Sequence, residues 1–122
     1  MRLWHQNLIT KLPRQQLLGQ HRECCALRGN GWGKPHSTIN YIFKYDLERL
    51  FAYHTLIMNE MERRGYKVDD NWKNIAYRGK ICPPMGNILH ITISGLVYPE
   101  HDDTYLIECI KNLVNKNIRL EV

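Results

Sequence analysis

The chain has 122 residues, the length of a single domain, which is enough to bury a core without support from metals or disulfides. Its hydrophobic content of 43% and charged content of 24% are ordinary for a soluble globular protein, and no stretch is long and apolar enough to span a bilayer. The net charge of +5 indicates an anionic partner, with nucleic acid favoured over a membrane surface.

The net positive charge is concentrated at the amino-terminal end of the sequence, because acids are almost absent there. The first 45 residues contain seven Lys or Arg but only one acid, Glu23, whereas 46–70 and 100–108 hold ten of the twelve acids. This segregation predicts a basic patch of the kind that binds a phosphate backbone, with one carboxylate inside it. The seven cations are Arg2, Lys11, Arg14, Arg22, Arg28, Lys34 and Lys44.

The amino terminus lacks the apolar core and the small-residue cleavage site of a signal peptide. We therefore expect a cytoplasmic protein whose four cysteines are reduced. They form no Cys-x-x-Cys pair, although His21 and Cys25, one helical turn apart, could supply half of a metal site. Small buried apolar side chains are the better interpretation of these cysteines, so we expect neither a metal nor a cofactor.

A helix is predicted between Pro13, which suits its first turn, and Gly29, which suits a left-handed stop. Glu23 points away from the apolar side of this helix, and no cation lies three or four residues from it. An acid without a local ion pair fits the close approach of a ligand, although a solvated surface position is the commoner role. The apolar side consists of Leu17, Leu18, His21, Cys24 and Cys25.

The segment 29–36 is a glycine-rich loop that resembles a phosphate-binding loop only superficially. Pro35 follows Lys34 where Ser or Thr is needed, and no strand precedes the glycines. We expect a mobile basic loop in which Lys34 contacts phosphate and Trp32 stacks or acts as a wedge. Packing of Trp32 on the core is an equally good alternative.

A second helix is predicted from Asp46, at its amino end, to Gly65, which caps it after Arg63 and Arg64. His54 lies on its apolar face, and we expect it to be a hydrogen-bonded core histidine. That face is formed by Leu47, Leu50, Phe51, His54, Ile57, Met58 and Met61.

Basic and aromatic residues interleave over 66–87, as in many nucleic-acid-binding surfaces, although a solvated irregular connection explains them almost as well. The stretch 88–94 fits either a strand or a buried helix. A third helix is predicted over about 104–115, after the capping residues Asp102 and Asp103. The whole sequence, 1–122, therefore predicts one compact, mainly α domain of about three main helices with long connecting loops.

Two segments together carry a resemblance to a known family. They resemble the first and second helices of the pyrimidine-dimer DNA glycosylase/AP lyase family, often called endonuclease V. The resemblance covers about residues 1–70, with a shortened loop near 29–40, and it fades beyond residue 80. The matching residues are Leu12, Gln15, Leu17, Arg22 and Glu23 in the first segment, and Phe43, Lys44, Tyr45, Asp46, Leu56, Ile57, Arg64, Gly65 and Tyr66 in the second.

The resemblance implies a helical enzyme that cuts DNA at ultraviolet-induced cyclobutane pyrimidine dimers. In this family a terminal α-amine attacks C1′ of the damaged nucleotide, a Schiff base forms, and β-elimination breaks the strand. An adenine opposite the lesion is flipped out. By position, Glu23 matches the helix glutamate that assists this chemistry. The resemblance implies damaged double-stranded DNA as the partner, with Arg2 and Arg22 matching residues that hold the DNA backbone and Arg28 as a looser correspondence. We also expect Gln15, Trp32 and Lys34 to contact DNA and the protein to be a monomer.

The amino terminus departs from the family pattern. The familiar enzyme loses its initiator methionine and uses the amine of a small second residue. Here the second residue is Arg2, which is too large for ordinary methionine excision. We therefore expect Met1 to be retained and its nitrogen to be the nucleophile, with Glu23 as the second catalytic residue.

Two alternatives stay open at this point. A non-catalytic nucleic-acid-binding module accounts equally well for the basic patch, Trp32 and the interleaved aromatic residues. A glycosylase of the same type that acts on another damaged or modified base is the second, because the lesion-reading residues are the least clear part of the resemblance.

Overall fold

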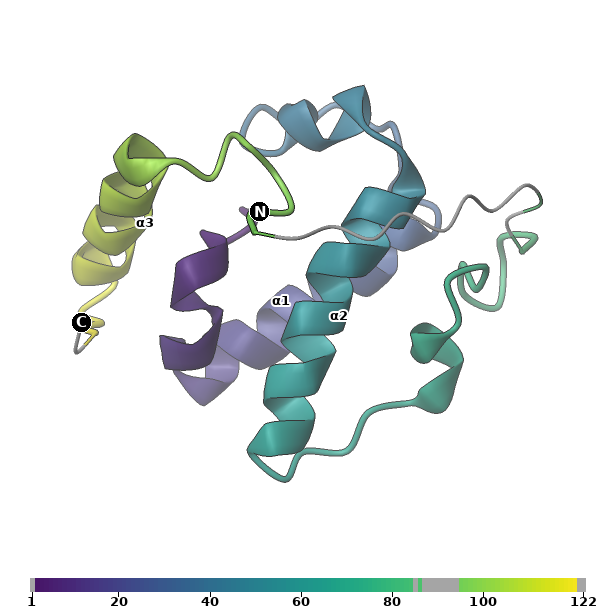
Figure 1. Ribbon diagram of the computed structural model, residues 1–122, viewed down its shortest axis with the longest axis horizontal. Coiled ribbons are helices and arrows are strands. Elements are labelled where there is room, and N and C mark those ends of the chain that lie inside the picture. Colours follow the sequence, from purple (N-terminus) through teal and green to yellow (C-terminus); the bar gives the residue numbers. More distant parts are fainter. Residues whose placement is uncertain (1, 85, 87–94, 121–122) are drawn as a thin grey trace.

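The protein is described by a computed structural model that covers residues 2–84, 86 and 95–120. These residues contain three α-helices and three short 3₁₀ helices, so the predicted mainly α fold is confirmed (Figure 1). The segment 88–94, which the sequence assigned to a strand or a buried helix, lies outside the described residues. The elements in chain order are η1 (Gln6–Lys11), α1 (Arg14–Arg28), η2 (Asn40–Lys44), α2 (Leu47–Arg63), η3 (Asp70–Lys73) and α3 (Asp103–Asn115).

The helices α1 and α2 form the centre of the fold, and η1 packs beside α2 (Figure 1). Each presents an apolar stripe to the other, as the predicted helical spacing requires. The buried residues include Leu17, Cys24 and Leu27 from α1, and Leu50, Tyr53, Ile57, Met58 and Met61 from α2. The amino-terminal segment, residues 2–4, packs against this helix pair.

Both ends of α1 lie where the sequence predicted, but Gly29 has a different role. Pro13 is the residue before the first turn, and Gly29 follows the last residue of the helix. The φ of Gly29 is −98°, so the predicted left-handed stop is wrong. A Cβ at this position would lie 2.9 Å from the backbone oxygen of Arg78. Glycine is therefore needed here for the close approach of two backbones.

The boundaries predicted for α2 are confirmed. Asp46 is the residue before the helix, and Gly65 adopts a φ of +84° just after it. Arg64 pairs with the buried Glu60 at 2.6 Å and also donates to the carbonyl of Leu12 at 2.7 Å. Arg64 thereby joins the end of α2 to the chain segment before α1.

Helix α3 begins after Asp102, whose side chain accepts a hydrogen bond from the backbone N–H of Tyr105 at 2.8 Å. The predicted capping role of Asp102 is therefore confirmed. Cys109 and Leu113 turn into the core. In Figure 1, α3 lies beyond η1, on the side of the molecule away from the centre of α2.

Candidate active site

The amino-terminal segment is held at successive backbone groups by side chains of the helices. The Oε1 atom of Gln20 accepts from the N–H of Trp4 at 2.7 Å, and the hydroxyl of Tyr53 donates to the carbonyl of Trp4 at 2.6 Å. The hydroxyl of Tyr105 donates to the carbonyl of Leu3. Chain ends usually fray unless they are tied down. Here Leu3 and Trp4 are fully packed into the core.

Gln20 also connects this segment to the carboxylate that the sequence singled out. Its Nε2 atom donates to the carbonyl of Arg2 at 3.1 Å and to Oε2 of Glu23 at 2.9 Å. One side-chain amide of α1 therefore bonds both the backbone of Arg2 and the Glu23 carboxylate. Met1 lies outside the described residues.

Glu23 lines a cavity of about 230 Å³ between the amino-terminal segment, α1 and α3. The ammonium of Lys116 lies 5.5 Å from the ring centroid of Trp4, so a cation from the end of α3 borders the same cavity. The lining residues are Arg2, Trp4, Glu23, Thr38, Asn112 and Lys116. The cavity therefore contains one acid, two cations and polar side chains that can donate hydrogen bonds.

The surroundings of Glu23 shift its pKa upwards, although they include opposing effects. Burial raises the pKa of this carboxyl, because the charged form loses solvent. The charges of the amino terminus, Lys116 and Arg22, together with the hydrogen bond from Gln20, act in the opposite direction. Glu23 is thus half-buried and hydrogen-bonded, which excludes the alternative of a fully solvated surface acid.

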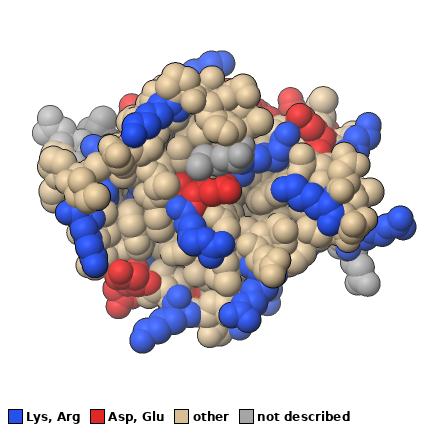
Figure 2. Space-filling model, turned by 180° about the vertical axis from the view of Figure 1, so that it is seen from behind, with Lys and Arg blue, Asp and Glu red and all other residues tan. Residues whose placement is uncertain are grey.

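Of the predicted DNA-contacting residues, Arg2 lies in the cavity with Glu23. It also reaches Glu108 on α3, at 3.5 Å. Arg22, Gln15 and Lys34 are exposed, and Arg22 is close enough to influence the charge of Glu23. On the face shown in Figure 2, Lys and Arg side chains are widely spread and surround a small acidic area.

Trp32 is half-buried and packs edge-on against Phe43, with ring centroids 5.0 Å apart and planes at 89°. The structure therefore favours the packing alternative for this residue over a free stacking or wedging role. The loop that carries it still presents Lys34 to solvent.

Arg28 has a different place from the one expected. The sequence assigned it to DNA, but its side chain is 2% exposed. Its guanidinium donates to Nδ1 of His54 at 2.9 Å and to the backbone oxygen of Trp72 at 2.8 Å. It also donates to the backbone oxygens of Asn74 at 2.8 Å and Tyr77 at 3.1 Å. The predicted phosphate contact is wrong for this residue, because its donors are used inside the fold.

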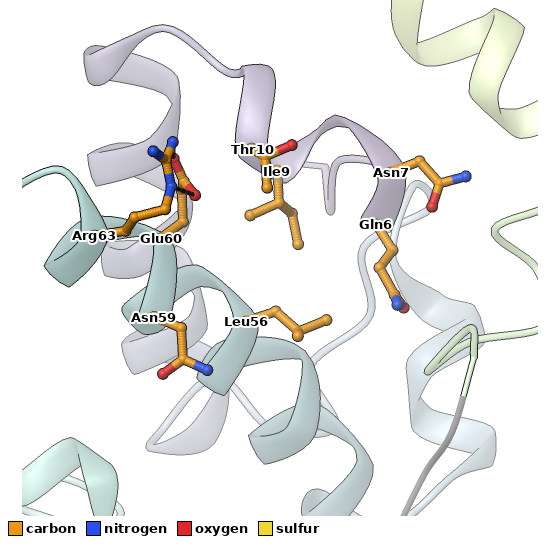
Figure 3. Close-up of a pocket in the computed structure, with 8 residues that line it drawn as sticks. All are labelled: Gln6, Asn7, Ile9, Thr10, Leu56, Asn59, Glu60 and Arg63. Atoms are coloured by element: carbon orange, nitrogen blue, oxygen red, sulfur yellow. Dashed lines mark hydrogen bonds and ion pairs between the residues drawn. The ribbon is translucent and has the colours of Figure 1, made fainter.

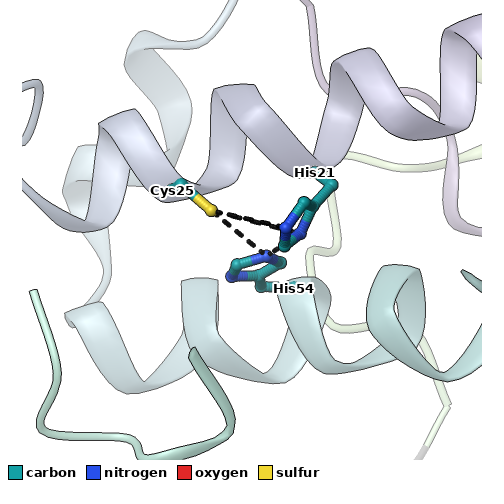
Figure 4. Close-up of side chains that lie close together, drawn as sticks. All are labelled: His21, Cys25 and His54. Carbon is teal, nitrogen blue, oxygen red and sulfur yellow. Dashed lines mark hydrogen bonds between the residues drawn. The ribbon is translucent and has the colours of Figure 1, made fainter. Parts of the chain in front are cut away.

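The metal-ligand types that cluster in the described residues are His21, Cys25 and His54, whose ligand atoms all lie within 4.8 Å of one another (Figure 4). A guanidinium can only donate, so Arg28 fixes Nδ1 of His54 as an acceptor and leaves the proton on Nε2. That Nε2–H then donates to Nδ1 of His21 at 2.8 Å.

This hydrogen-bond pattern opposes metal binding. A metal-ligating histidine usually donates from its second ring nitrogen, whereas the second nitrogen of His54 already faces a donor. Burial raises the pKa of the Cys25 thiol to about 11, and it lowers the pKa of His54 to about 2. We therefore assign these residues to a neutral hydrogen-bonded network between α1 and α2. The expectation that His54 is a hydrogen-bonded core histidine is confirmed.

A larger hollow, of about 510 Å³, lies between η1 and α2 (Figure 3). The apolar side chains of Ile9 and Leu56 face this space, and Glu60 and Arg63 are paired at its edge. Its acid, Glu60, is already bound by Arg63 and Arg64. The hydrogen bonds from these arginines lower the pKa of Glu60, and burial only partly opposes them. The hollow therefore offers shape but no free catalytic group among its lining residues.

The sequence did not single out Trp4, Thr38, Asn112 or Lys116 among the lining residues of the Glu23 cavity, nor Gln20 beside it. Gln20 was visible only as a neighbour of Glu23 on the helix, and its contacts with Arg2 and Trp4 depend on the tertiary structure. Asn112 and Lys116 lie about 90 residues further along the chain, where the sequence offers no periodicity that links them to Glu23.

A basic helical protein with a half-buried carboxylate and two cations in one cavity has the features of an enzyme that acts on nucleic acid. The family model described as pyrimidine dimer DNA glycosylase matches residues 1–74. The chain belongs to this family. Membership supports a function as a DNA glycosylase in DNA repair, with DNA as the partner. The match covers α1 and α2 and ends before α3.

Searches of the curated proteins and of the solved structures found no significant match to the chain. Within the part of the chain that the structure describes, no helix has the length and apolar character needed to cross a membrane.

Proposed function

We propose that this protein excises cyclobutane pyrimidine dimers from double-stranded DNA and then cleaves the strand as an AP lyase. The reaction uses the α-amine of Met1 as the nucleophile and Glu23 as the assisting carboxylate. The proposal is supported mainly by one observation: Gln20 hydrogen-bonds both the backbone of Arg2 and the Glu23 carboxylate. A reaction on a terminal amine requires a carboxylate held in a fixed relation to the first residues of the chain, and this bond to Arg2 supports such a relation.

The first chemical step replaces one bond to C1′ by another. The neutral amine of Met1 attacks C1′, the bond from C1′ to the base breaks, and the base leaves with the bonding electron pair and takes up a proton. The α-amine has an ordinary pKa of about 7.7–8.0, so a useful fraction is neutral at physiological pH. The covalent intermediate divides one difficult displacement into easier steps.

The later steps need a group that can move protons at the sugar. After ring opening, the Schiff base acidifies C2′. Loss of a C2′ proton and departure of the 3′ phosphate then break the strand, and water hydrolyses the imine to restore the amine. Ionised Glu23 stabilises the developing positive charge at C1′ and accepts the proton. The raised pKa of Glu23 makes it a better base than an exposed carboxylate.

DNA binding is assigned to the exposed or cavity-lining cations, which are Arg2, Arg22, Lys34 and Lys116, together with Gln15. We leave Arg28 out of this surface because it is buried. A dimer weakens stacking and pairing, so a kinked duplex with a flipped nucleotide costs less at the lesion than in intact DNA. We expect the protein to act as a monomer on this substrate.

The direct test of this function compares three duplexes of the same sequence. One is undamaged, one contains a single thymine dimer, and one contains a different lesion such as an alkylated purine. We expect strand cleavage of the dimer duplex alone. Cleavage of the third duplex alone would instead support a glycosylase for another base, and tight binding without any cleavage would support a non-catalytic binding module.

A further inference from the structure

We propose that Gln20 is the positioning residue of the active site, and that it holds the amino-terminal segment and the Glu23 carboxylate in one fixed relation. The inference rests on the proposed function, because it gives Gln20 a role in a reaction between a terminal amine and DNA. Gln20 itself does not contact the reacting atoms in this account. It acts through the groups to which it is bonded.

The side chain of Gln20 is buried and hydrogen-bonded on both its nitrogen and its oxygen. It is 1% exposed. Its two N–H donors point to the carbonyl of Arg2 and to Glu23, at 3.1 and 2.9 Å. Its oxygen accepts from the N–H of Trp4 at 2.7 Å and lies 3.0 Å from the hydroxyl of Tyr53, whose single proton is shared with the nearer carbonyl of Trp4. Both donors of the amide and one of its acceptor positions are therefore fully occupied, and the second acceptor position has a share of the Tyr53 proton.

The orientation of this amide is determined by its partners. The carbonyl of Arg2 can only accept, and the backbone N–H of Trp4 can only donate. A flipped amide would set oxygen against oxygen and N–H against N–H at these two contacts. One rigid group therefore spans two residues of the amino-terminal segment and the carboxylate on the next turn of α1.

Other contacts hold the amino-terminal segment without reaching Glu23. The hydroxyl of Tyr53 binds the carbonyl of Trp4, and that of Tyr105 binds the carbonyl of Leu3. The segment therefore has anchors of its own. What Gln20 adds to them is the link between the chain end and Glu23, and catalysis is sensitive to such a relation because small displacements of reacting groups are costly.

The same contact affects the charge of Glu23. A donated hydrogen bond favours the ionised carboxylate, so the bond from Gln20 lowers the pKa that burial raises. Loss of the donor must then raise the pKa of Glu23. If ionised Glu23 is the active form, the acid side of the pH–rate profile moves to higher pH in a variant that lacks this donor.

The test uses tag-free full-length protein and a duplex with one abasic site, under single-turnover conditions from pH 5 to pH 8. Gln20→Met keeps the length of the side chain and removes its polar atoms. Tyr53→Phe is the matched control, because it removes a buried hydroxyl at the same place, whose proton lies between the carbonyl of Trp4 and the oxygen of Gln20, and it touches neither Arg2 nor Glu23. Thermal melting and DNA affinity are measured for each protein.

We expect Gln20→Met to bind DNA within about twofold of the parent and to cleave about 10- to 100-fold more slowly, as expected for misplaced catalytic groups. The acid side of the pH–rate profile should lie at higher pH for Gln20→Met than for the parent. For Tyr53→Phe it should lie at the same pH as for the parent. If Gln20→Met does not fold, Gln20→Asn replaces it, because an amide shorter by one methylene cannot span the same partners and should show the same changes.

Two other outcomes overturn the inference, and they differ from each other. If the parent cleaves but the Gln20 variant has the rate and pH profile of Tyr53→Phe, Gln20 is merely structural and the proposed function stands. If the parent neither cleaves the abasic duplex nor forms a reducible adduct with it, the proposed function fails and the role of Gln20 fails with it.

Discussion

Arg28 on α1 donates from Nη1 to Nδ1 of His54 on α2, at 2.9 Å. The guanidinium also lies over the rings of Phe51 and Trp72, at 4.9 and 5.0 Å from their centroids. This contact joins the two central helices to the segment that follows α2. A cation that the sequence associated with DNA is therefore a buried part of the core.

The first prediction concerns the stability that this contact provides. Replacement of Arg28 by Met should lower the free energy of unfolding by about 3 kcal/mol or more, because several buried acceptors lose their donor. Urea denaturation followed by far-ultraviolet circular dichroism measures the change. The matched control is Arg22→Met, an exposed position on the same helix, which should leave the unfolding midpoint close to that of the parent. Equal midpoints for the two variants would contradict the role of Arg28.

The second prediction concerns acid pH. Burial lowers the pKa of His54 to about 2 and that of His101 to about 3. In the unfolded chain both protonate near their ordinary pKa of about 6.5. Below that pH the unfolded chain binds more protons, so the free energy of unfolding falls as the pH falls. Each histidine contributes a slope of up to about 1.4 kcal/mol per pH unit.

Urea denaturation at pH 7.5, 6.0 and 5.0 measures this slope. The stabilising contribution of these histidines should be complete above about pH 7 and should decrease steadily towards pH 5. In His101→Asn the slope should be smaller, because one of the two proton-linked groups has been removed. A stability that is constant between pH 7.5 and pH 5.0 would show that neither histidine is held neutral.

The third prediction concerns Glu23. Replacement by Gln keeps the shape of the side chain and removes its charge, so DNA affinity should be retained. Strand cleavage should fall by about 100-fold or more, the range typical for loss of a general acid or base. Single-turnover cleavage of an abasic duplex gives the rate, and fluorescence anisotropy gives the affinity. Cleavage at the parent rate would remove Glu23 from the mechanism.

The fourth prediction concerns the cations that bind phosphate. Arg22→Ala and Lys116→Ala should each reduce the slope of log K against log salt concentration by about 0.9, the change for one lost phosphate contact. Lys73→Ala is the control, because Lys73 is occupied with Glu62 and Asp70, at 2.7 and 3.2 Å. An unchanged slope for Lys116→Ala would show that α3 does not contribute to the DNA-binding surface.

Much of the fold could be predicted from the sequence because its signals are local. The apolar spacing of α2 and the glycine after Arg64 define that helix without tertiary information, and Asp102 does the same for the start of α3. Gly29 shows the limit of such signals. Its position at the end of α1 was predicted, but the approach of Arg78 that requires glycine there is a tertiary contact.

The candidate site was less predictable, because charge alone does not tell which cations reach the surface. Arg22 and Arg28 have the same side chain and lie on one helix, yet the first is exposed and the second is buried. The difference arises because the segment 72–77 folds back against α1, where its backbone carbonyls accept hydrogen bonds from Arg28. Lys116 lines the same cavity as Glu23 because α3 packs against the amino-terminal segment.

The most direct measurement is a borohydride trapping experiment on the tag-free protein with its native amino terminus. The protein is mixed with a duplex that contains one thymine dimer, reduced with sodium borohydride, digested and analysed by mass spectrometry. We predict a covalent DNA adduct on the nitrogen of Met1, absent with undamaged duplex and absent when the amino terminus carries an extension. An active protein that has lost Met1, or cleavage of the dimer duplex without any adduct, would contradict the account.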